Sequence, residues 1–491
     1  MSNEIALLTA SEMSRRMGAG ELKAEQILDS VLDQVRAHNK VLNAVVTLDE
    51  KGARAQARKA DAALAQGESL GALHGIPVTI KDSFETAGLL TTSGFPKLKN
   101  HIPQQDATPV ARLKAAGAVI VGKTNLAMLA SDFQTNNPVF GRSNNPWNTD
   151  CTTGGSTGGG AAAVAAGMSA LELGSDLGGS VRLPAHYCGI SSFKPSATRI
   201  SLVGHIPGSA APGMKAGPST LGFMATPGIL ARSASDLPVA IKSLAGSDPR
   251  WADVPPMPLE VHHGNGSDNL KGLRVAWTSG FPGLVTSSET RAAMQSAAQS
   301  LADAGCIVEE RMPQTFDFAA AREAWGELTG CLLGSGLGMI PRNLFRLHIF
   351  MNGDRSDMKR GVVRGMGQKF SRFNDACRLR DESVAQIEEF LNAWDVWLCP
   401  VAGGPAFKHQ KTGKHIDIDG QRAEYLQATG GYTSLFNFTG NPVLVLPVGF
   451  TTTGLPIGAQ LATCRWGDDR LLSLAPALEK TMGAYQPPPM V

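Results

Sequence analysis

The chain has 491 residues, which allows one large domain or two to three ordinary ones. Its 45 Lys and Arg residues against 43 Asp and Glu residues give a formal net charge of +2, so the totals predict no nucleic-acid partner. No run of 18 or more apolar residues is present, which argues against a membrane protein. The first 16 residues do not read as a secretion signal, and the seven cysteines include no C-x-x-C pair. We therefore expect a protein of the reducing cytoplasm.

The N-terminal third alternates between helical and strand-like patterns. Apolar residues recur at helical spacing within 9–39, and 50–67 predicts an Ala-rich, charge-laced helix. β-Branched residues then predict a strand at 75–82, and a helix followed by a strand recurs over 110–125. Strand, helix and strand are predicted again over 272–310. This alternation is typical of a layered α/β protein.

Other segments depart from that alternation. Residues 145–190 are rich in Gly, Ser and Ala, and 204–228 form a long Gly/Pro/Ser loop of a kind that is usually functional or mobile. Residues 317–396 are predicted to be mostly helical with scattered aromatic residues. The chain returns to strands before a last helix near 468–482.

Residues 117–124 match the phosphate-binding pattern G-x-x-x-x-G-K-[ST] literally. A phosphate loop needs a strand before the first glycine and a helix that begins at the lysine. Here a helix precedes the glycine, and residues 118–121 (AVIV) are themselves strand-like. We therefore predict a core strand and no nucleotide site.

Residues 154–158 (GGSTG) match G-x-S-x-G, the nucleophile elbow of α/β-hydrolases. The elbow follows a buried strand, whereas the preceding residues 144–153 are polar, so the α/β-hydrolase fold does not fit. A Ser-His-Asp triad could still use a later histidine, and no sequence context singles one out. The candidates are His186, His205, His262, His263, His348, His409 and His415.

A third pattern covers more of the chain. The glycine-rich block 154–160 is followed by a small-residue helix and then by GSDLGGSVRLPAHYCGISSFKPS at 174–196. This combination resembles the amidase signature family. Further family elements follow in the family order at 75–82, 122–125, 140–148, 226–237 and 437–461, whereas 245–395 is weakly covered.

The resemblance implies one large α/β/α layered domain around a twisted mixed sheet. N-terminal helices would occupy about 1–68, and the core about 69–244 and 397–491. A variable, largely helical insertion would occupy about 245–396.

The resemblance also implies a catalytic set in which Ser180 is the nucleophile, Ser156 the bridging hydroxyl and Lys81 the base. An amide carbonyl is a poor electrophile, so its attacker needs a proton acceptor and its oxyanion needs prepositioned donors. Successive backbone N–H groups beside two glycines can supply those donors. The predicted oxyanion hole consists of Leu177, Gly178, Gly179 and Ser180.

Other residues are predicted to support this set. Asp176 and Arg182 would fix the loop through hydrogen bonds, and the backbone of Ala130 matches a family position that faces the substrate. The family also implies a cis peptide bond at Ser156. A solvated lysine has a pKa of about 10.4, and burial at the end of an apolar strand can lower the pKa of Lys81 enough for it to accept a proton. No metal or organic cofactor is needed.

The leading functional interpretation is a stand-alone serine amidohydrolase that forms an acyl-enzyme and could also cleave esters, anilides and carbamates (urethanes). One alternative is the glutamine-hydrolysing subunit of a tRNA-dependent amidotransferase. That subunit typically carries an acidic residue and Phe soon after its T/S-N motif, whereas Asn125 is followed by LAMLASDF. The other alternative, an inactive binding protein, is disfavoured because all three catalytic residue types are present.

The predicted partners are a small-molecule amide, ester or carbamate, with no nucleic acid and no membrane, and the chain is predicted to be a monomer or homodimer. We further expect the loop 204–228 and the segment 317–352 to roof the substrate pocket.

Overall fold

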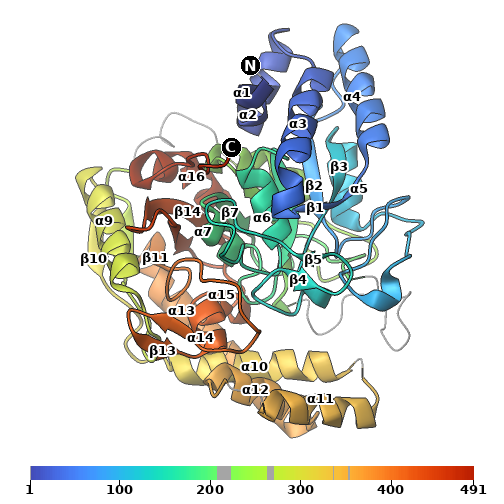
Figure 1. The fold of residues 1–491 in the computed structure, drawn as a ribbon. Coiled ribbons are helices and arrows are strands. Elements are labelled where there is room, and N and C mark those ends of the chain that lie inside the picture. Colours follow the sequence, from blue (N-terminus) through green and yellow to red (C-terminus); the bar gives the residue numbers. More distant parts are fainter. Residues whose placement is uncertain (1, 207–222, 262–269, 336, 352–353) are drawn as a thin grey trace.

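The structure, a computed structural model, describes residues 2–206, 223–261, 270–335, 337–351 and 354–491 (Figure 1). Its centre is one 11-stranded sheet that mixes parallel and antiparallel pairs. Across the sheet the strands are β1 (Val45–Leu48), β3 (Val119–Thr124), β2 (Pro77–Lys81), β6 (Leu171–Asp176), β8 (Thr226–Ala231), β7 (Ser191–Lys194), β14 (Val443–Phe450), β15 (Pro456–Ala462), β11 (Val396–Pro400), β9 (Arg274–Trp277) and β10 (Ile307–Glu310).

Helices surround this sheet, and two short ribbons lie outside it. The helices are α1 (Ser2–Ala6), α2 (Ala10–Gly18), α3 (Ala24–Leu42), α4 (Glu50–Ala65), α5 (Thr108–Ala115), α6 (Gly158–Ala165), α7 (Arg182–Cys188), α8 (Leu237–Leu244), α9 (Ser288–Asp303), α10 (Phe318–Ser335), α11 (Met339–Met351), α12 (Asp357–Gly365), α13 (Phe370–Asn392), α14 (Tyr425–Gly430), α15 (Ser434–Phe438) and α16 (Asp468–Met482). The ribbons pair β4 (Asn136–Asn137) with β5 (Gly141–Arg142), and β12 (Ile416–Ile418) with β13 (Gln421–Ala423).

Alternation along β2 decides which side chains reach the site. Val78 and Ile80 point into the main apolar core, which α5, α8, α9 and α16 cover. Successive side chains of a strand point to opposite faces, so Thr79 and Lys81 point to the other face, where α6 and α7 pack. The lysine therefore leaves the core strand on the same side as the glycine-rich start of α6.

A second body of helices lies beyond the sheet, at the bottom of Figure 1. There α10 packs against α12 and α13 and reaches back to α15. An aromatic core that includes Trp325, Trp397 and Phe436 joins these helices to β11.

The predicted fold class is confirmed, and so is the strand interpretation of the phosphate-loop match, because Val119–Thr124 form β3 in full. The strand–helix–strand prediction over 272–310 corresponds to β9, α9 and β10, so the predicted helical insertion also supplies two strands to the main sheet. Of the predicted loop 204–228, residues 207–222 lie outside the described residues, and 226–228 begin β8. No helix in the described ranges is long and apolar enough to cross a membrane.

Candidate active site

Lys81 is the last residue of β2, and its side chain is fully buried. Its Nζ lies 2.7 Å from Oγ of Ser156, 3.0 Å from Oγ of Ser175 and 3.3 Å from the Ser175 carbonyl oxygen. Three oxygen atoms therefore fix the amine at the end of the strand. The predicted lysine and bridging serine are in direct contact.

Burial lowers the pKa of Lys81 from about 10.5 to about 7, although the carboxylates of Asp176 and Glu172 oppose that shift. Both acidic residues lie on β6, next to β2 in the sheet. Burial also raises the pKa of Glu172 to about 7, which weakens its charge near neutral pH. A large fraction of Lys81 can therefore be neutral, and able to accept a proton, at physiological pH.

Ser156 stands just before the first turn of α6. The Gly155–Ser156 peptide bond is cis, as the family resemblance implies. A Cβ atom at Gly155 would lie 2.6 Å from the carbonyl oxygen of Asp132, so the segment that follows Ala130 packs directly on this bond. Only glycine fits this close approach.

Ser180 lies in the turn that joins β6 to α7. The backbone N–H of Thr157 donates to its carbonyl at 3.1 Å, which ties this turn to the residue after Ser156. Ser180 keeps 8 % of its surface exposed whereas Ser156 keeps none, so Ser180 is the more accessible of the two serines. Among the described residues no hydrogen bond joins the two hydroxyl groups.

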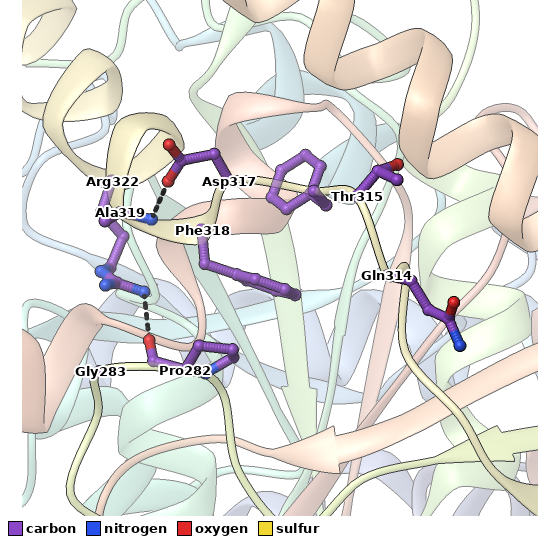
Figure 2. Close-up of a pocket in the computed structure, with 9 residues that line it drawn as sticks. Pro282, Gly283, Gln314, Thr315, Asp317, Phe318, Ala319 and Arg322 are labelled. Carbon is purple, nitrogen blue, oxygen red and sulfur yellow. Dashed lines mark hydrogen bonds between the residues drawn. The ribbon is translucent and has the colours of Figure 1, made fainter.

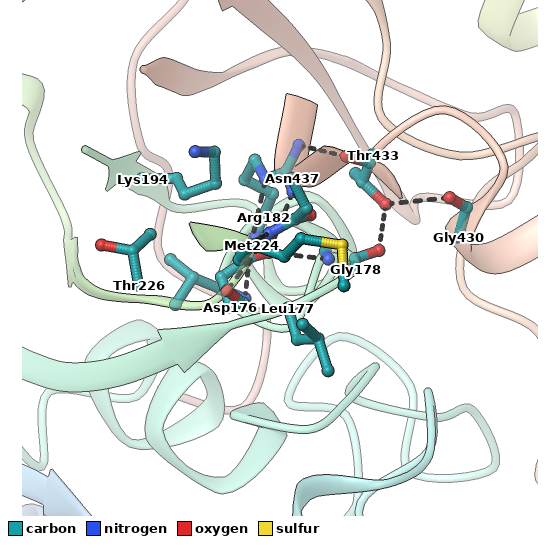
Figure 3. A network of polar contacts seen from close by, with 12 residues as sticks. Asp176, Leu177, Gly178, Arg182, Lys194, Met224, Thr226, Gly430, Thr433 and Asn437 are labelled. Carbon is teal, nitrogen blue, oxygen red and sulfur yellow. Dashed lines mark hydrogen bonds and ion pairs between the residues drawn. The ribbon is translucent and has the colours of Figure 1, made fainter. Parts of the chain in front are cut away.

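The buried carboxylate of Asp176 organises this turn (Figure 3). It accepts hydrogen bonds from the N–H groups of Gly179 (2.8 Å) and Val181 (3.0 Å), and it pairs with Arg182 at 2.9 Å. Burial alone would raise the pKa of Asp176, but the Arg182 guanidinium holds it well below its usual value. Both predicted supporting residues thus contact the predicted loop.

One of the four predicted oxyanion-hole amides is already engaged, because Gly179 donates to Asp176. In the part of the chain that the structure describes, the amides of Leu177, Gly178 and Ser180 have no intramolecular acceptor. Gly179 adopts φ of +124°, and a Cβ atom there would lie 2.3 Å from Oγ1 of Thr433. This position therefore requires glycine.

The carbonyl groups of the same turn are held by residues for which the sequence predicted no such role. Nε1 of Trp325, on α10, donates to the Leu177 carbonyl at 3.0 Å, and Oγ1 of Thr433 donates to the Gly178 carbonyl at 2.5 Å. The amide of Asn437 bonds both the carbonyl and the carboxylate of Asp176 (Figure 3). These contacts hold the carbonyls of the turn in place. No local sequence pattern predicts them.

Ala130 ends a short 3₁₀ turn, Met128–Ala130, in which Leu129 and Ala130 have φ of +51° and +56°. Left-handed backbone costs roughly 1–2 kcal/mol for a residue with a Cβ atom, so the surrounding structure must impose it. The nearby N–H of Ala127 donates to the Ser156 carbonyl at 3.3 Å. The predicted backbone position, Ala130, thus lies three residues from Ala127, which contacts Ser156.

A family model described as Amidase matches residues 26–472. The chain belongs to the amidase signature family. It is 32 % identical to a glutamyl-tRNA(Gln) amidotransferase subunit of Thermosynechococcus vestitus over 98 % of this chain and 99 % of that one. Among solved structures, one described as an amidase has 26 % identity and a TM-score of 0.78, covering 97 % of this chain and all of that one. A bacterial aryl acylamidase has 22 % identity and a TM-score of 0.82, with 96 % of each chain covered, which supports the fold alone.

The comparisons contradict the predicted partner set, which excluded nucleic acid and limited the chain to a monomer or homodimer. Curated relatives that match over nearly their whole length are named as one subunit of an amidotransferase for glutamyl-tRNA(Gln). The balanced net charge therefore did not justify excluding nucleic acid. An even total says nothing of how charges are distributed or of what a subunit assembles with.

The histidine alternative gains no support from the described residues. His186 contacts the Gly404 carbonyl and the Gly458 amide, and none of the described histidines bonds Ser156 or Ser180. His262 and His263 lie outside the described residues. His205 contacts the hydroxyl group of Ser175 instead of either predicted catalytic serine.

A separate pocket opens at the start of α10 (Figure 2). Its Arg322 donates to the Pro282 carbonyl at 3.3 Å and pairs with Asp357 at 2.8 Å, so the guanidinium is held by the protein itself. None of the predicted site residues lines this pocket, which comprises Pro282, Gly283, Gln314, Thr315, Phe316, Asp317, Phe318, Ala319 and Arg322.

Proposed function

We propose that this chain cleaves amide bonds through an acyl-enzyme on Ser180, with Ser156 as proton bridge and Lys81 as base. The observation that carries the proposal is the 2.7 Å contact between Nζ of Lys81 and Oγ of Ser156 at a fully buried position. Burial lowers the pKa of this lysine to about 7, which suits a general base at neutral pH.

In the proposed reaction, Oγ of Ser180 attacks the carbonyl carbon while its proton passes to Ser156 and the proton of Ser156 passes to Lys81. The tetrahedral intermediate then expels the amine, which takes a proton back along the same path. Water attacks the acyl-enzyme by the same relay and releases the acid. The three side chains of this proton relay all belong to the chain.

The oxyanion would be bound by the three unengaged amides of the turn, those of Leu177, Gly178 and Ser180. The fourth predicted donor, Gly179, would serve indirectly, since its bond to Asp176 holds the turn. Trp325 and Thr433 would keep the carbonyls of this turn from rotating into the hole.

Two kinds of enzyme, which differ in their substrate, fit this chemistry. A stand-alone amidohydrolase would act on free amides, and anilides, esters and carbamates (urethanes) belong to the same proposal. A glutamine-hydrolysing subunit of a tRNA-dependent amidotransferase would act on glutamine together with partner chains. The names of the curated relatives favour this second candidate. The segment LAMLASDF after Asn125, which lacks the early acidic residue and Phe typical of that subunit, favours the first.

The test is to purify the chain alone and assay a neutral anilide and glutamine side by side, with Ser180→Ala as the matched control. Turnover of the anilide supports the stand-alone enzyme. Hydrolysis of glutamine but not of the anilide, at a rate that rises when the other amidotransferase chains are added, supports the second candidate. Turnover that survives Ser180→Ala would refute the shared chemistry.

A further inference from the structure

His205 reaches the proposed base through one intervening hydroxyl group. Its Nε2 lies 2.7 Å from Oγ of Ser175, and that oxygen lies 3.0 Å from Nζ of Lys81. Nζ in turn lies 2.7 Å from Oγ of Ser156. A continuous chain of three hydrogen bonds therefore runs from the imidazole to the bridging serine.

The histidine is held by the segment that carries the lysine. The N–H of Ile206 donates to the Ser83 carbonyl at 2.6 Å, and the N–H of Glu85 donates to the Gly204 carbonyl at 2.9 Å. The ring of Phe84, which is fully buried, lies with its centroid 4.8 Å from that of His205. Base and imidazole are thus fixed relative to one another by residues 81–85.

The direction of the hydrogen bonds follows from the groups present. Lys81 carries at least two N–H donors in either protonation state, so Ser175 Oγ can accept from it throughout the reaction. The Ser175 hydroxyl proton is then free to be donated to Nε2 of His205, which requires the proton of the imidazole to be on Nδ1. Burial, and secondarily the Lys81 charge, lower the pKa of His205 to about 3, so the ring stays neutral while Lys81 titrates.

We propose that His205 is a positioning residue for the base: by accepting from Ser175, it turns the lone pairs of that hydroxyl toward Lys81 and keeps the amine aligned with Ser156. This inference rests on the proposed function, because it concerns the same lysine. Among the described residues, the charged groups that shift the pKa of Lys81 are Asp176 and Glu172, both on β6. The charged group that shifts the pKa of His205 is Lys81. A hydrogen bond to a charged form favours that form, so the Ser175 hydroxyl that His205 aligns would favour the protonated form of Lys81.

The test compares His205→Leu, which removes the acceptor, with His205→Gln, whose side-chain amide oxygen restores one. The leucine variant should lose about tenfold in kcat at unchanged KM, as expected for one lost hydrogen bond in the catalytic relay. Its acid limb in kcat/KM should move to lower pH, since the charged lysine is less stabilised. The glutamine variant should recover most of both effects.

Covalent labelling of Ser180 by a fluorophosphonate, followed by intact mass across pH, distinguishes a failure of the proposed function from a failure of the positioning role of His205. If the wild-type protein is not labelled at Ser180, the proposed function fails. If it is labelled, and His205→Leu keeps the wild-type kcat and pH profile, the positioning role alone is refuted. A raised KM with unchanged kcat would also refute it, because it would make His205 a substrate contact.

A second variant, Ser175→Ala, tests whether His205 acts through Ser175, because it removes the hydroxyl between the imidazole and the amine and leaves the imidazole in place. It should shift the acid limb in the same direction as His205→Leu, and the double variant should add little to either. Full additivity of the two shifts would show that His205 does not act through Ser175 and would overturn the proposal.

Discussion

The face of the sheet around Lys81 and the helical segment α10–α13 differ in how they expose their side chains. Lys81, Ser156 and Arg182 are completely buried, and each is hydrogen-bonded. In α11, by contrast, no residue is buried, and Ile340 and Leu344 are 70 % and 64 % exposed. The site residues therefore lie inside the protein, whereas α11 lies at its surface.

The comparison also divides the segment that we expected to roof the pocket. In α10, Trp325 bonds the turn that carries Ser180, and its ring would lie 2.6 Å from a Cβ atom at Gly178. In α11, Arg346 donates to the Val363 carbonyl of α12 while apolar side chains face outward. We therefore expect α10 to influence catalysis and α11 to influence it little.

The largest effect should come from the nucleophile. Ser180→Ala should abolish both turnover and fluorophosphonate labelling, because no other group can form the acyl-enzyme. Ser156→Ala should lose roughly 10²–10⁴-fold in kcat as a proton relay. Peptide mapping after labelling checks both, and a labelled peptide that contains Ser156 but not Ser180 would contradict the assignment.

The next largest effect is on stability and concerns the buried base. Because folding lowers the pKa of Lys81 from about 10.5 to about 7, the unfolded chain binds more protons between these values, and wild-type stability rises with pH across that window. Below about 7 the cost is constant, at about 5 kcal/mol. Lys81→Met should be inactive, and its stability relative to wild type should fall by about 3 kcal/mol between pH 7 and 9.5.

Denaturant unfolding of both proteins at the two pH values measures that change. The replacement removes the hydrogen bonds of Lys81 at both pH values, so their contribution to the free energy of unfolding cancels when the two differences are compared. A difference that stays constant with pH would mean that Lys81 is charged in the folded protein across the whole window.

A smaller effect is expected at the contact between the two regions. Trp325→Phe keeps an aromatic ring but removes the N–H that holds the Leu177 carbonyl, so kcat should fall about five- to tenfold with little change in KM. Steady-state kinetics on one anilide or amide substrate measures this. An unchanged kcat would disconnect α10 from the oxyanion turn.

The smallest effect is expected on α11. Leu344→Ser should leave kcat within twofold of wild type and change the free energy of unfolding by no more than about 0.5 kcal/mol, since this side chain is exposed. It is the matched control for Trp325→Phe. A loss in kcat as large as that of Trp325→Phe would show that α11 takes part in the site after all.

The sequence could predict the parts of the fold and the site that depend on neighbouring residues, but not the contacts between residues that are far apart along the chain. Alternation and helical spacing predicted β3, α4 and α9 because those patterns are local. The family motif singled out Lys81 and Ser156, whose side chains are in contact in the structure. Trp325 and Thr433 contact the turn from 148 and 255 positions away, and nothing near either residue distinguishes it from ordinary core. His205 was one of seven undistinguished histidines until the fold set it beside Ser175.

The central claim is that a neutral Lys81 drives acylation of Ser180, and the pH dependence of single-turnover acylation tests it most directly. The rate should rise with pH through one ionisation near pH 7, as the lysine loses its proton, and it should be lost in Lys81→Met. A rate that is flat between pH 6 and 9, or a Lys81→Met variant that still acylates Ser180 at the wild-type rate, would contradict the account.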